Sequence, residues 1–386
     1  MMTRYGLALM ICGVVAAGLG RVFGAIELYV IAAGLMVLPL LSWAIVLLSR
    51  PRLRMTRIIT PSRIFVNESA RVDLVVQNAA WRTSPVVRLN DPVAGTIGAQ
   101  LSVTPLRPRR EARATYRLPS ERRGHLEIGP MRMQRRDPFG LASRIRTVAP
   151  VAGVLVHPAW SLLEFPDRWS GSGPLALLIR RRLLARQTEE FHSLRNYVPG
   201  DDLRRVHWKQ SARSEELKIK QTDPEAVQRV AILLDVATEH HTPDSFEAAV
   251  SAAASFALSA ERAGFRVHAA VSAVGEAPAA DVDEFLDVLA LVEAGAGRLL
   301  TDAIHDVTRM LEGGMVVLIT GRPHPDALAA LRNAAPGTDA GLLVVCEPTA
   351  AARLGDGFVR GGFALDGSTP DSLVRDWTRL IGPGAA

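Results

Sequence analysis

The 386-residue sequence has little of several features that mark common functional classes. It holds two cysteines, Cys12 and Cys346, and both lie in apolar runs, so no disulfide framework is available. It has no G-x-x-x-x-G-K loop and no G-x-S-x-G element, which argues against nucleotide hydrolysis by the chain itself and against α/β-hydrolase chemistry. Only 5% of the residues are aromatic, and none is interleaved with the arginine clusters, which argues against a nucleic-acid partner.

Long uncharged segments, by contrast, lie near the N-terminus and raise the mean hydropathy of the chain to +0.15. The run from Leu28 to Leu48 would span about 30 Å as a helix, which is the thickness of the hydrocarbon core. Tyr5 to Gly20 forms a shorter run that comes first in the chain, and a cleaved signal peptide is an alternative for it because Met1 to Arg4 is basic. The second apolar run follows almost at once, which favours a transmembrane helical hairpin over residues 1–50.

Arginines indicate the orientation of this hairpin. The second apolar run is followed by four of them, whereas the short connection between the runs holds only Arg21 and Glu27; the four are Arg50, Arg52, Arg54 and Arg57. Positive charge concentrates on the cytoplasmic side of membrane proteins. We therefore predict a multi-pass protein of the cell membrane, with two spans and cytoplasmic N- and C-termini. The further arginine clusters of a tethered chain favour anionic lipid or a protein partner.

The rest of the chain changes its periodicity once. Residues 51–150 show period-two alternation, as in Glu111 to Leu118, and this pattern predicts an immunoglobulin-like β-sandwich. Residues 225–386 alternate apolar strands such as Val230 to Leu234 with helices, which predicts a mostly parallel sheet covered on both faces. Residues 151–224 connect the two and include a predicted helix near 175–188. The predicted fold class is thus multidomain: helical hairpin, β-sandwich and C-terminal α/β domain.

The segment 189–213 gathers basic, acidic and aromatic side chains around a predicted turn at Pro199-Gly200. Asp201 or Asp202 can then begin a short helix over 203–213, on which Arg204, Trp208 and Ser211 share a face. One interpretation is an ion-pair network of Arg195, Asp201 and Arg204 that docks the segment on the sheet, with Trp208 as a core or interdomain anchor. The other is direct contact of the same groups with a partner.

A hydrolase is a third possibility for this segment. His207 could serve as a base, oriented by Asp201 or Asp202, with Ser211 four residues further along the helix. No nucleophile motif supports this arrangement, so we expect a binding protein with no small-molecule substrate rather than an enzyme.

The same segment resembles a bacterial family called "domain of unknown function 58". The hallmark residues of that family stand here as Phe191, Leu194-Arg195, Tyr197, Pro199-Gly200-Asp201, Arg204, Val206, Trp208 and Ser211-Ala212-Arg213. Arg123-Gly124 and Asp137-Pro138-Phe139-Gly140-Leu141 resemble two shorter signatures of the family. The resemblance implies an α/β domain similar to von Willebrand factor type A modules (Rossmann-like). It also implies a MoxR-type AAA+ ATPase as partner and an unknown client protein, so the predicted function is that of a membrane-anchored scaffold.

Type A modules often bind a divalent cation through Asp-x-Ser-x-Ser after the first strand, with a threonine and an aspartate from later loops. In this sequence Asp235 is in place, but Ala237 and Glu239 occupy the serine positions, and the later loop reads Thr320-Gly321 without an aspartate. Thr301 could supply the threonine. We expect neither a metal nor another cofactor, although Glu239 could compensate and leave a cation-dependent adhesion module as the alternative function. His240 and His241 could form a transition-metal site with Asp235, but neighbouring histidines are more often a surface feature.

Overall fold

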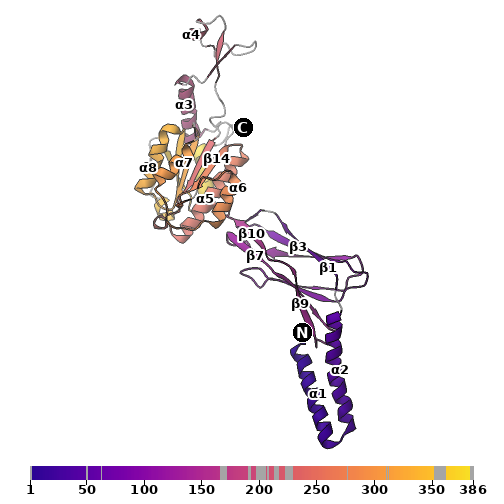
Figure 1. The fold of residues 1–386 in the computed structure, drawn as a ribbon. Coiled ribbons are helices and arrows are strands. Elements are labelled where there is room, and N and C mark those ends of the chain that lie inside the picture. The colour runs from indigo at the N-terminus through magenta and orange to yellow at the C-terminus, as the bar shows by residue number, and fades with distance from the viewer. Residues whose placement is uncertain are drawn as a thin grey trace. The chain divides into compact units, whose positions relative to one another are not determined.

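A computed structural model describes residues 2–48, 51–61, 63–165, 172–189, 193–196, 206, 208–212, 217–221, 229–275, 277–309, 311, 313–351 and 362–382. They form two compact units, Met1–Val156 and His157–Ala386 (Figure 1). The first holds a helical hairpin and antiparallel sheets, and the second holds a parallel sheet with its helices.

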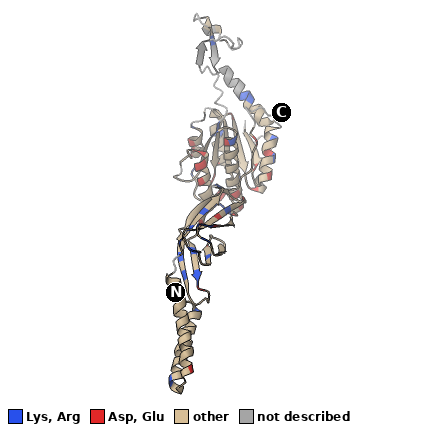
Figure 2. Cartoon of the chain, turned by 90° about the vertical axis from the view of Figure 1, so that its right-hand side faces the viewer, with Lys and Arg blue, Asp and Glu red and all other residues tan. Residues whose placement is uncertain are grey.

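The hairpin consists of α1 (Arg4–Phe23) and α2 (Ile26–Leu48), which pack against each other. Both are long and apolar enough to cross a membrane, with mean hydropathies of 1.9 and 2.5. Figure 2 shows them almost free of charge, with the charged residues near their ends. Glycines permit the close packing: a Cβ on Gly13 would lie 2.9 Å from Met36 Cγ.

Ten short strands follow, and their bounds are β1 (Leu53–Thr60), β2 (Ile64–Phe65), β3 (Ala70–Asn78), β4 (Val87–Asp91), β5 (Ala99–Val103), β6 (Glu111–Leu118), β7 (Gly124–Ile128), β8 (Met131–Arg136), β9 (Ser143–Ala149) and β10 (Ala152–His157). They form sheets in the orders β1-β3-β6, β2-β10-β7 and β5-β4-β8-β9. Side chains from all three sheets share one core, which includes Val72, Ile128 and Met131. The alternation in Glu111–Leu118 correctly predicted a half-buried strand.

The turn with the Asp-Pro-Phe-Gly-Leu signature holds the hairpin to these sheets. The Thr3 N–H donates to Leu141 O over 2.8 Å, and Thr3 Oγ1 donates to Gly140 O over 2.7 Å. Asp137 fixes the turn from inside, because its carboxylate accepts from the N–H groups of Phe139 and Ala142 at 3.0 and 2.6 Å. A Cβ on Gly6 would lie 2.3 Å from Leu141 O, so only glycine fits at this point of α1. The signature is therefore a structural junction.

The second unit is built on five parallel strands, as the alternation of apolar runs and helices predicted. These are β13 (Arg229–Leu234), β14 (Arg266–Val271), β15 (Met315–Thr320), β16 (Ala340–Val345) and β17 (Gly362–Asp366), in the order β14-β13-β15-β16-β17. Helices α7 (Leu300–Thr308) and α8 (Pro325–Ala334) pack on alternate strand residues such as Leu233 and Leu318. Both faces of the strands are buried, which explains their continuous apolar sequence.

The remaining helices of the unit are α5 (Pro243–Arg262), α6 (Val282–Leu291), α9 (Pro348–Ala351) and α10 (Pro370–Ile381), with 3₁₀ turns η4 (Thr238–His240) and η5 (Ala335–Gly337). Thr242 begins α5 with a capping box to Ser245, and Gly264 follows its end at φ +81°. α5 and α10 pack on each other, and Trp377 of α10 is buried beside Phe256 of α5.

The connecting segment differs in part from its prediction. Its described elements are α3 (Pro174–Glu189), β11 (Ser193–Asn196), α4 (Trp208–Ser211) and β12 (Lys218–Gln221). The predicted helix near 175–188 is present as α3. Of the helix predicted over 203–213, the described part is the single turn α4. The antiparallel pairing of β11 with β12 was not predicted, because the strands are short and twenty-one residues apart, with no hairpin signal between them.

Candidate functional site

A group of polar side chains lies at the carboxyl edge of the parallel sheet, where three neighbouring strands end. Asp235 follows β13, Ser272 follows β14, and Thr320 is the last residue of β15. Strand β13 lies between β14 and β15. The connection after β13 therefore leads to the strand on one side of it, and the connection after β14 leads to the strand on the other side. Parallel α/β sheets bind their ligands at such a switch point, beyond the carboxyl ends of the strands.

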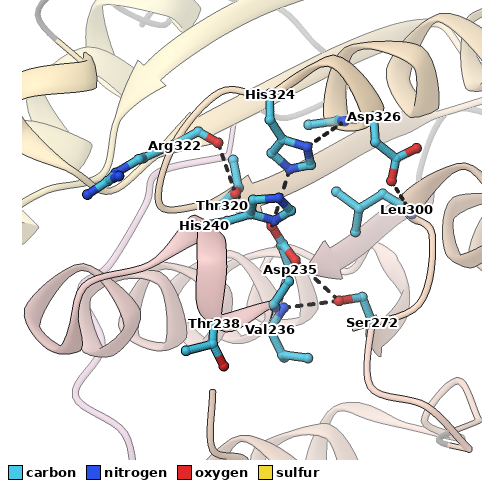
Figure 3. A network of polar contacts seen from close by, with 12 residues as sticks. Asp235, Val236, Thr238, His240, Ser272, Leu300, Thr320, Arg322, His324 and Asp326 are labelled. Atoms are coloured by element: carbon cyan, nitrogen blue, oxygen red, sulfur yellow. Dashed lines mark hydrogen bonds and ion pairs between the residues drawn. The ribbon is translucent and has the colours of Figure 1, made fainter. Parts of the chain in front are cut away.

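Asp235 is the centre of this group and is 1% exposed. Thr320 Oγ1 donates to its Oδ2 over 2.8 Å, and the Ala237 N–H donates to its Oδ1 over 3.1 Å. Ser272 Oγ lies 3.4 Å from Oδ1 and also accepts from the Val236 N–H at 3.0 Å (Figure 3). These donors hold the carboxylate in one orientation.

Two histidines complete what we call the Asp235 cluster, formed by Asp235, His240, Ser272, Thr320 and His324. His240 Nδ1 lies 2.7 Å and His324 Nε2 lies 3.4 Å from the same oxygen, Oδ2 of Asp235. Their rings stack, with centroids 3.6 Å apart and planes 16° apart (Figure 3). His324 also caps α8, since its Nδ1 accepts from the Ala327 N–H at 3.4 Å. In the neutral ring the proton therefore lies on Nε2, toward Asp235.

Electrostatics keep Asp235 ionised. Burial by itself raises the pKa of this carboxyl, but hydrogen bonds from His324, Ala237 and Thr320 and the charge of His240 outweigh it and lower the pKa to about 2. Burial lowers the pKa of the adjacent His241, and the charge of Asp235 opposes that shift only partly. His241 is therefore neutral at pH 7, and its ring packs edge-on against Phe246.

Gly321 allows the loop after β15 to approach these histidines. A Cβ at this position would lie 2.2 Å from the His240 carbonyl oxygen and 2.9 Å from His241 Nδ1. A side chain there would push η4 away from the sheet. The Thr320-Gly321 pair, read in the sequence as a loop without its aspartate, thus supplies a hydroxyl for Asp235 and space for His240.

The other residues predicted for a cation site are not brought to Asp235. Glu239 is exposed in η4, and Ala237 contributes only its backbone N–H. Thr301, in α7, lines a cavity of about 430 Å³ together with Arg298 and Asp306, and the lining of that cavity includes none of the five cluster side chains. The view of His240 and His241 as a surface feature is wrong, because both rings are partly buried and His240 contacts Asp235.

Sequence reasoning missed three members of the cluster: Ser272, His324, and Thr320 as a hydroxyl partner of Asp235. Two of these stand at the carboxyl ends of apolar strands, and this position is the signal that could have found them. His324 comes from the loop before α8, and its N-cap position with Pro325 at the first helical turn carries no sign of a contact with Asp235.

The predicted recognition segment is described only in part. Phe191, Tyr197, Pro199, Gly200, Asp201, Asp202, Arg204, His207 and Arg213 lie outside the described residues, so the ion-pair network and the hydrolase arrangement stay predictions. Arg195 lies in β11, and Ser211 Oγ accepts from the Lys218 N–H at 2.8 Å. Trp208 is 64% exposed, so the prediction of a core anchor is wrong, whereas an anchor between domains stays a prediction. A single helical turn offers it too little apolar surface to cover the ring.

A known protein family matches the part of the chain that holds most of the recognition segment and the whole Asp235 cluster. Residues 193–344 match the family model described as protein of unknown function DUF58. The DUF58 resemblance is confirmed. The DUF58 match contains all five side chains of the Asp235 cluster and the segment from β11 to α4.

No curated protein matches the chain. Similar solved structures include a CARDB domain from Pyrococcus furiosus, with 19% identity, 28% of this chain and 91% of that chain covered, and a TM-score of 0.21. A putative cell surface protein from Methanosarcina acetivorans has 15% identity, the same coverages and a TM-score of 0.21. At such scores the fold rests on the strand pairing described above, and the function rests on the residues of this chain.

Proposed function

We propose that the protein is a membrane-anchored cytoplasmic scaffold or adaptor, which presents the Asp235 edge of its α/β domain to a protein partner. The observation that carries this proposal is the attachment of both candidate spans to the folded body. Thr3, the N-cap of α1, bonds to Leu141, and Arg144 donates to Leu47 O near the end of α2 at 3.2 Å. Such an attachment fits helices that anchor a folded body rather than a leader that is cut away.

The orientation follows from charge. Arg52 and Arg54 follow α2 and are exposed, whereas Arg57 is paired with Asp91 and contributes little free charge. Arg21 and Glu27 at the other end of the hairpin offset each other. The positive-inside bias then favours an orientation with both termini in the cytoplasm.

The partner is proposed from the DUF58 resemblance, which implies a von Willebrand type A-like domain that works with a MoxR-type AAA+ ATPase on a client. The cluster at the switch point supports this role, since it combines buried polar groups with solvent access through the histidines: the His240 and His324 side chains are 23% and 13% exposed.

Site-specific photo-crosslinking in native membranes tests the proposal. A photoreactive residue replaces Glu239, which is exposed beside the cluster, and, as a matched control, Glu261, which is exposed at the opposite end of α5. We expect an AAA+ ATPase to be crosslinked from position 239 and not from position 261. Equal crosslinking from both positions, or none, would contradict the docking edge. Digestion of the C-terminal unit by protease added outside intact cells would overturn the cytoplasmic orientation.

A divalent-cation-dependent binding module is the second candidate, because the ligand atoms of Asp235, His240 and His324 all lie within 4.8 Å of one another. In that case a chelator abolishes the crosslink from position 239. A crosslink that survives chelation would contradict the cation-dependent module and is compatible with the scaffold proposal.

A further inference from the structure

The oxygen-rich cation site implied by the type A resemblance does not fit this chain. Mg²⁺ demands near-octahedral oxygen ligation. Ala237 has no side-chain oxygen, Glu239 is exposed, and Thr301 lines a different cavity. Asp235 is thus the one carboxylate in the cluster, and its immediate partners include two imidazoles.

This donor set suits a different class of ion. Zn²⁺ and similar transition metals are bound by imidazole nitrogen and carboxylate oxygen, often with three protein ligands and an open position. We propose that the Asp235 cluster binds a transition-metal ion of the Zn²⁺ class through Asp235, His240 and His324. The proposal deepens the second candidate function and does not depend on the ATPase partnership.

The three ligand atoms of the cluster lie close together, within 4.8 Å of one another. Two ligand atoms bound to one tetrahedral Zn²⁺, each at about 2.0–2.1 Å, lie about 3.3 Å apart. The His240 and His324 nitrogens lie 2.7 and 3.4 Å from Oδ2 of Asp235. Both nitrogens face the same oxygen, but the two rings are stacked with their planes 16° apart, and a metal ion lies in the plane of each imidazole that binds it. An ion between the three atoms therefore requires one ring to rotate out of the stack.

Surrounding groups support the ligands. Thr320 Oγ1 and the Ala237 N–H bond to the Asp235 carboxylate and hold its orientation, as the partners behind metal ligands do. The carboxylate is fully buried, but the His240 side chain is 23% exposed, so an ion can enter past this ring.

Binding through His324 Nε2 has one cost. The ring proton must then lie on Nδ1, and the Ala327 N–H loses its acceptor at 3.4 Å. That bond is at the long limit for an N–H donor, so the loss is small beside the gain of a metal–nitrogen bond. Binding is also expected to weaken at low pH, because protonated imidazole cannot be a ligand.

Calorimetry on the full-length chain in detergent, purified without a histidine tag, tests the site with ZnCl₂, CoCl₂ and MgCl₂. We expect one Zn²⁺ per chain and no heat from Mg²⁺. The variants His240→Ala and His324→Asn should weaken Zn²⁺ binding by about 100-fold or more, since loss of even an outer partner costs about 10- to 100-fold. Asn retains a cap for α8, which keeps the second variant folded. His305→Ala, an exposed histidine of α7, is the control and should bind as wild type.

Two results would overturn the site. One is wild-type protein that binds no Zn²⁺ or Co²⁺, and the other is folded His240→Ala and His324→Asn protein with unchanged affinity. Thermal unfolding of each variant without metal reports whether it is folded. Neither result touches the scaffold proposal, because the crosslink from position 239 is measured separately.

A second, independent observation concerns the end of the antiparallel sheets to which the hairpin is attached. Val87 pairs with Arg135 and Asn90 with Arg132, so the turn 137–142 after β8 lies beside the start of β4 and the loop 79–86. Asn78 joins that loop to the loop 104–110, since its Nδ2 donates to Arg82 O and Leu106 O at 2.8 Å each. These three loops form what we call the hairpin-proximal end.

Arginine and aromatic side chains gather at the hairpin-proximal end. Trp81 is 76% and Phe139 is 66% exposed. Four arginines of these loops are exposed as well: Arg82, Arg107, Arg109 and Arg110. The one carboxylate in the three loops is Asp137, which is buried and bonded to backbone N–H groups. At the other end, the segments 61–69 and 119–123 mix three arginines with Glu68 and Glu121.

The geometry points to anionic lipid as the partner of this end, given that α1 and α2 cross the membrane as proposed above. Thr3 caps α1 and bonds to Gly140 and Leu141, which places the turn with Phe139 at the end of the span. Aromatic rings are enriched at this depth, and arginines there attract acidic headgroups.

Spin labelling in reconstituted vesicles tests the contact. In a Cys12→Ser background, with Cys346 buried, a nitroxide on Phe139→Cys is compared with one on Ile97→Cys, which is 89% exposed beyond the far end of β4. We expect oxygen to reach label 139 better than a water-soluble nickel reagent does, and the reverse for label 97. In phosphatidylglycerol vesicles, Arg107→Gln, Arg109→Gln and Arg110→Gln together should reduce the protection of label 139. The same change at Arg71, Arg117 and Arg122 should not.

A label at 139 as water-accessible as the label at 97, in protein that still resists carbonate extraction, would overturn the lipid contact while leaving the anchor intact. Equal protection in phosphatidylcholine and phosphatidylglycerol vesicles, with no effect of the arginine changes, would overturn the part that concerns acidic headgroups.

Discussion

Two aspartates in this chain are equally buried and have different partners. Asp91 and Asp235 are each 1% exposed. Arg57 Nη2 lies 2.5 Å from Asp91, and the Tyr116 hydroxyl donates to it over 2.7 Å. The side-chain partners of Asp235 are two histidines and two hydroxyls. A permanent cation therefore neutralises Asp91, while the nearest cations of Asp235 are groups that can lose their charge.

This difference distinguishes the structural ion pair of Asp91 from the candidate binding site at Asp235. The Arg57 side chain is 8% exposed, so the Asp91 pair is closed to solvent. Burial and the bond to Asp91 raise the pKa of Tyr116, which keeps its hydroxyl a donor at any physiological pH. At Asp235 the partner histidines are partly exposed, with side-chain exposures of 23% for His240 and 13% for His324, so their nitrogens can turn to an ion or to a partner group.

The largest effect is expected at the closed pair. Arg57→Ala leaves Asp91 buried without its cation, which costs about 3–5 kcal/mol of unfolding free energy. Urea unfolding of the full-length protein in detergent measures this loss, and Arg54→Ala, an exposed arginine of the same strand, is the control. A loss under about 1 kcal/mol would mean that water reaches Asp91 and that the two aspartates are not different in kind.

We expect Asp235 to make the unfolding free energy of the α/β unit depend on pH. Its pKa is lowered in the folded protein to about 2, so the ionised form is stabilised by roughly 2–3 kcal/mol, at about 1.4 kcal/mol for each pKa unit below an unfolded value near 3.9. For a lowered pKa, this stability is complete above the unfolded value and is lost as pH falls through the folded one. Unfolding of the α/β unit should therefore become easier between about pH 4 and pH 2.

Asp235→Asn is the matched variant for that measurement. It should be less stable than wild type at pH 7, and the two proteins should converge as pH falls toward 2, because the amide does not titrate. Parallel curves for the two proteins over this range would show that Asp235 does not carry the pH dependence.

The same comparison indicates how far the sequence predicts such sites. The period-two pattern of Glu111–Leu118 and the apolar run Val230–Leu234 predicted the two kinds of sheet, since each pattern follows from which faces are buried. Asp235 was found because it ends an apolar strand. His324 was not, since it stands 89 residues further along and reaches Asp235 only through the order of β13 and β15 in the sheet. Local patterns predict elements, whereas a cluster assembled at the ends of three strands depends on the topology.

Gly321→Ala should have a smaller effect on stability and a clear effect on the cluster. The added Cβ meets the His240 carbonyl oxygen at 2.2 Å, so η4 must shift, at a cost of about 1–2 kcal/mol. We expect Zn²⁺ binding to weaken as His240 moves away from Asp235. Gly337→Ala, where nothing lies within 4 Å of the added Cβ, is the control. Wild-type metal affinity in a folded Gly321→Ala protein would show that η4 accommodates the methyl group without moving His240.

Glu239→Ala should have the smallest effect, and it decides between two descriptions of the same loop. If Glu239 replaced a missing oxygen ligand, its loss would weaken metal binding about as much as the loss of a histidine does. Its side chain is exposed in η4 and has no hydrogen bond to Asp235 among the described residues, so we expect stability to change by less than about 0.5 kcal/mol and Zn²⁺ affinity to stay unchanged. A large loss of Zn²⁺ affinity in calorimetry would mean that Glu239 is a metal ligand. The site would then be based on carboxylate oxygens, and histidines would no longer distinguish Asp235 from Asp91.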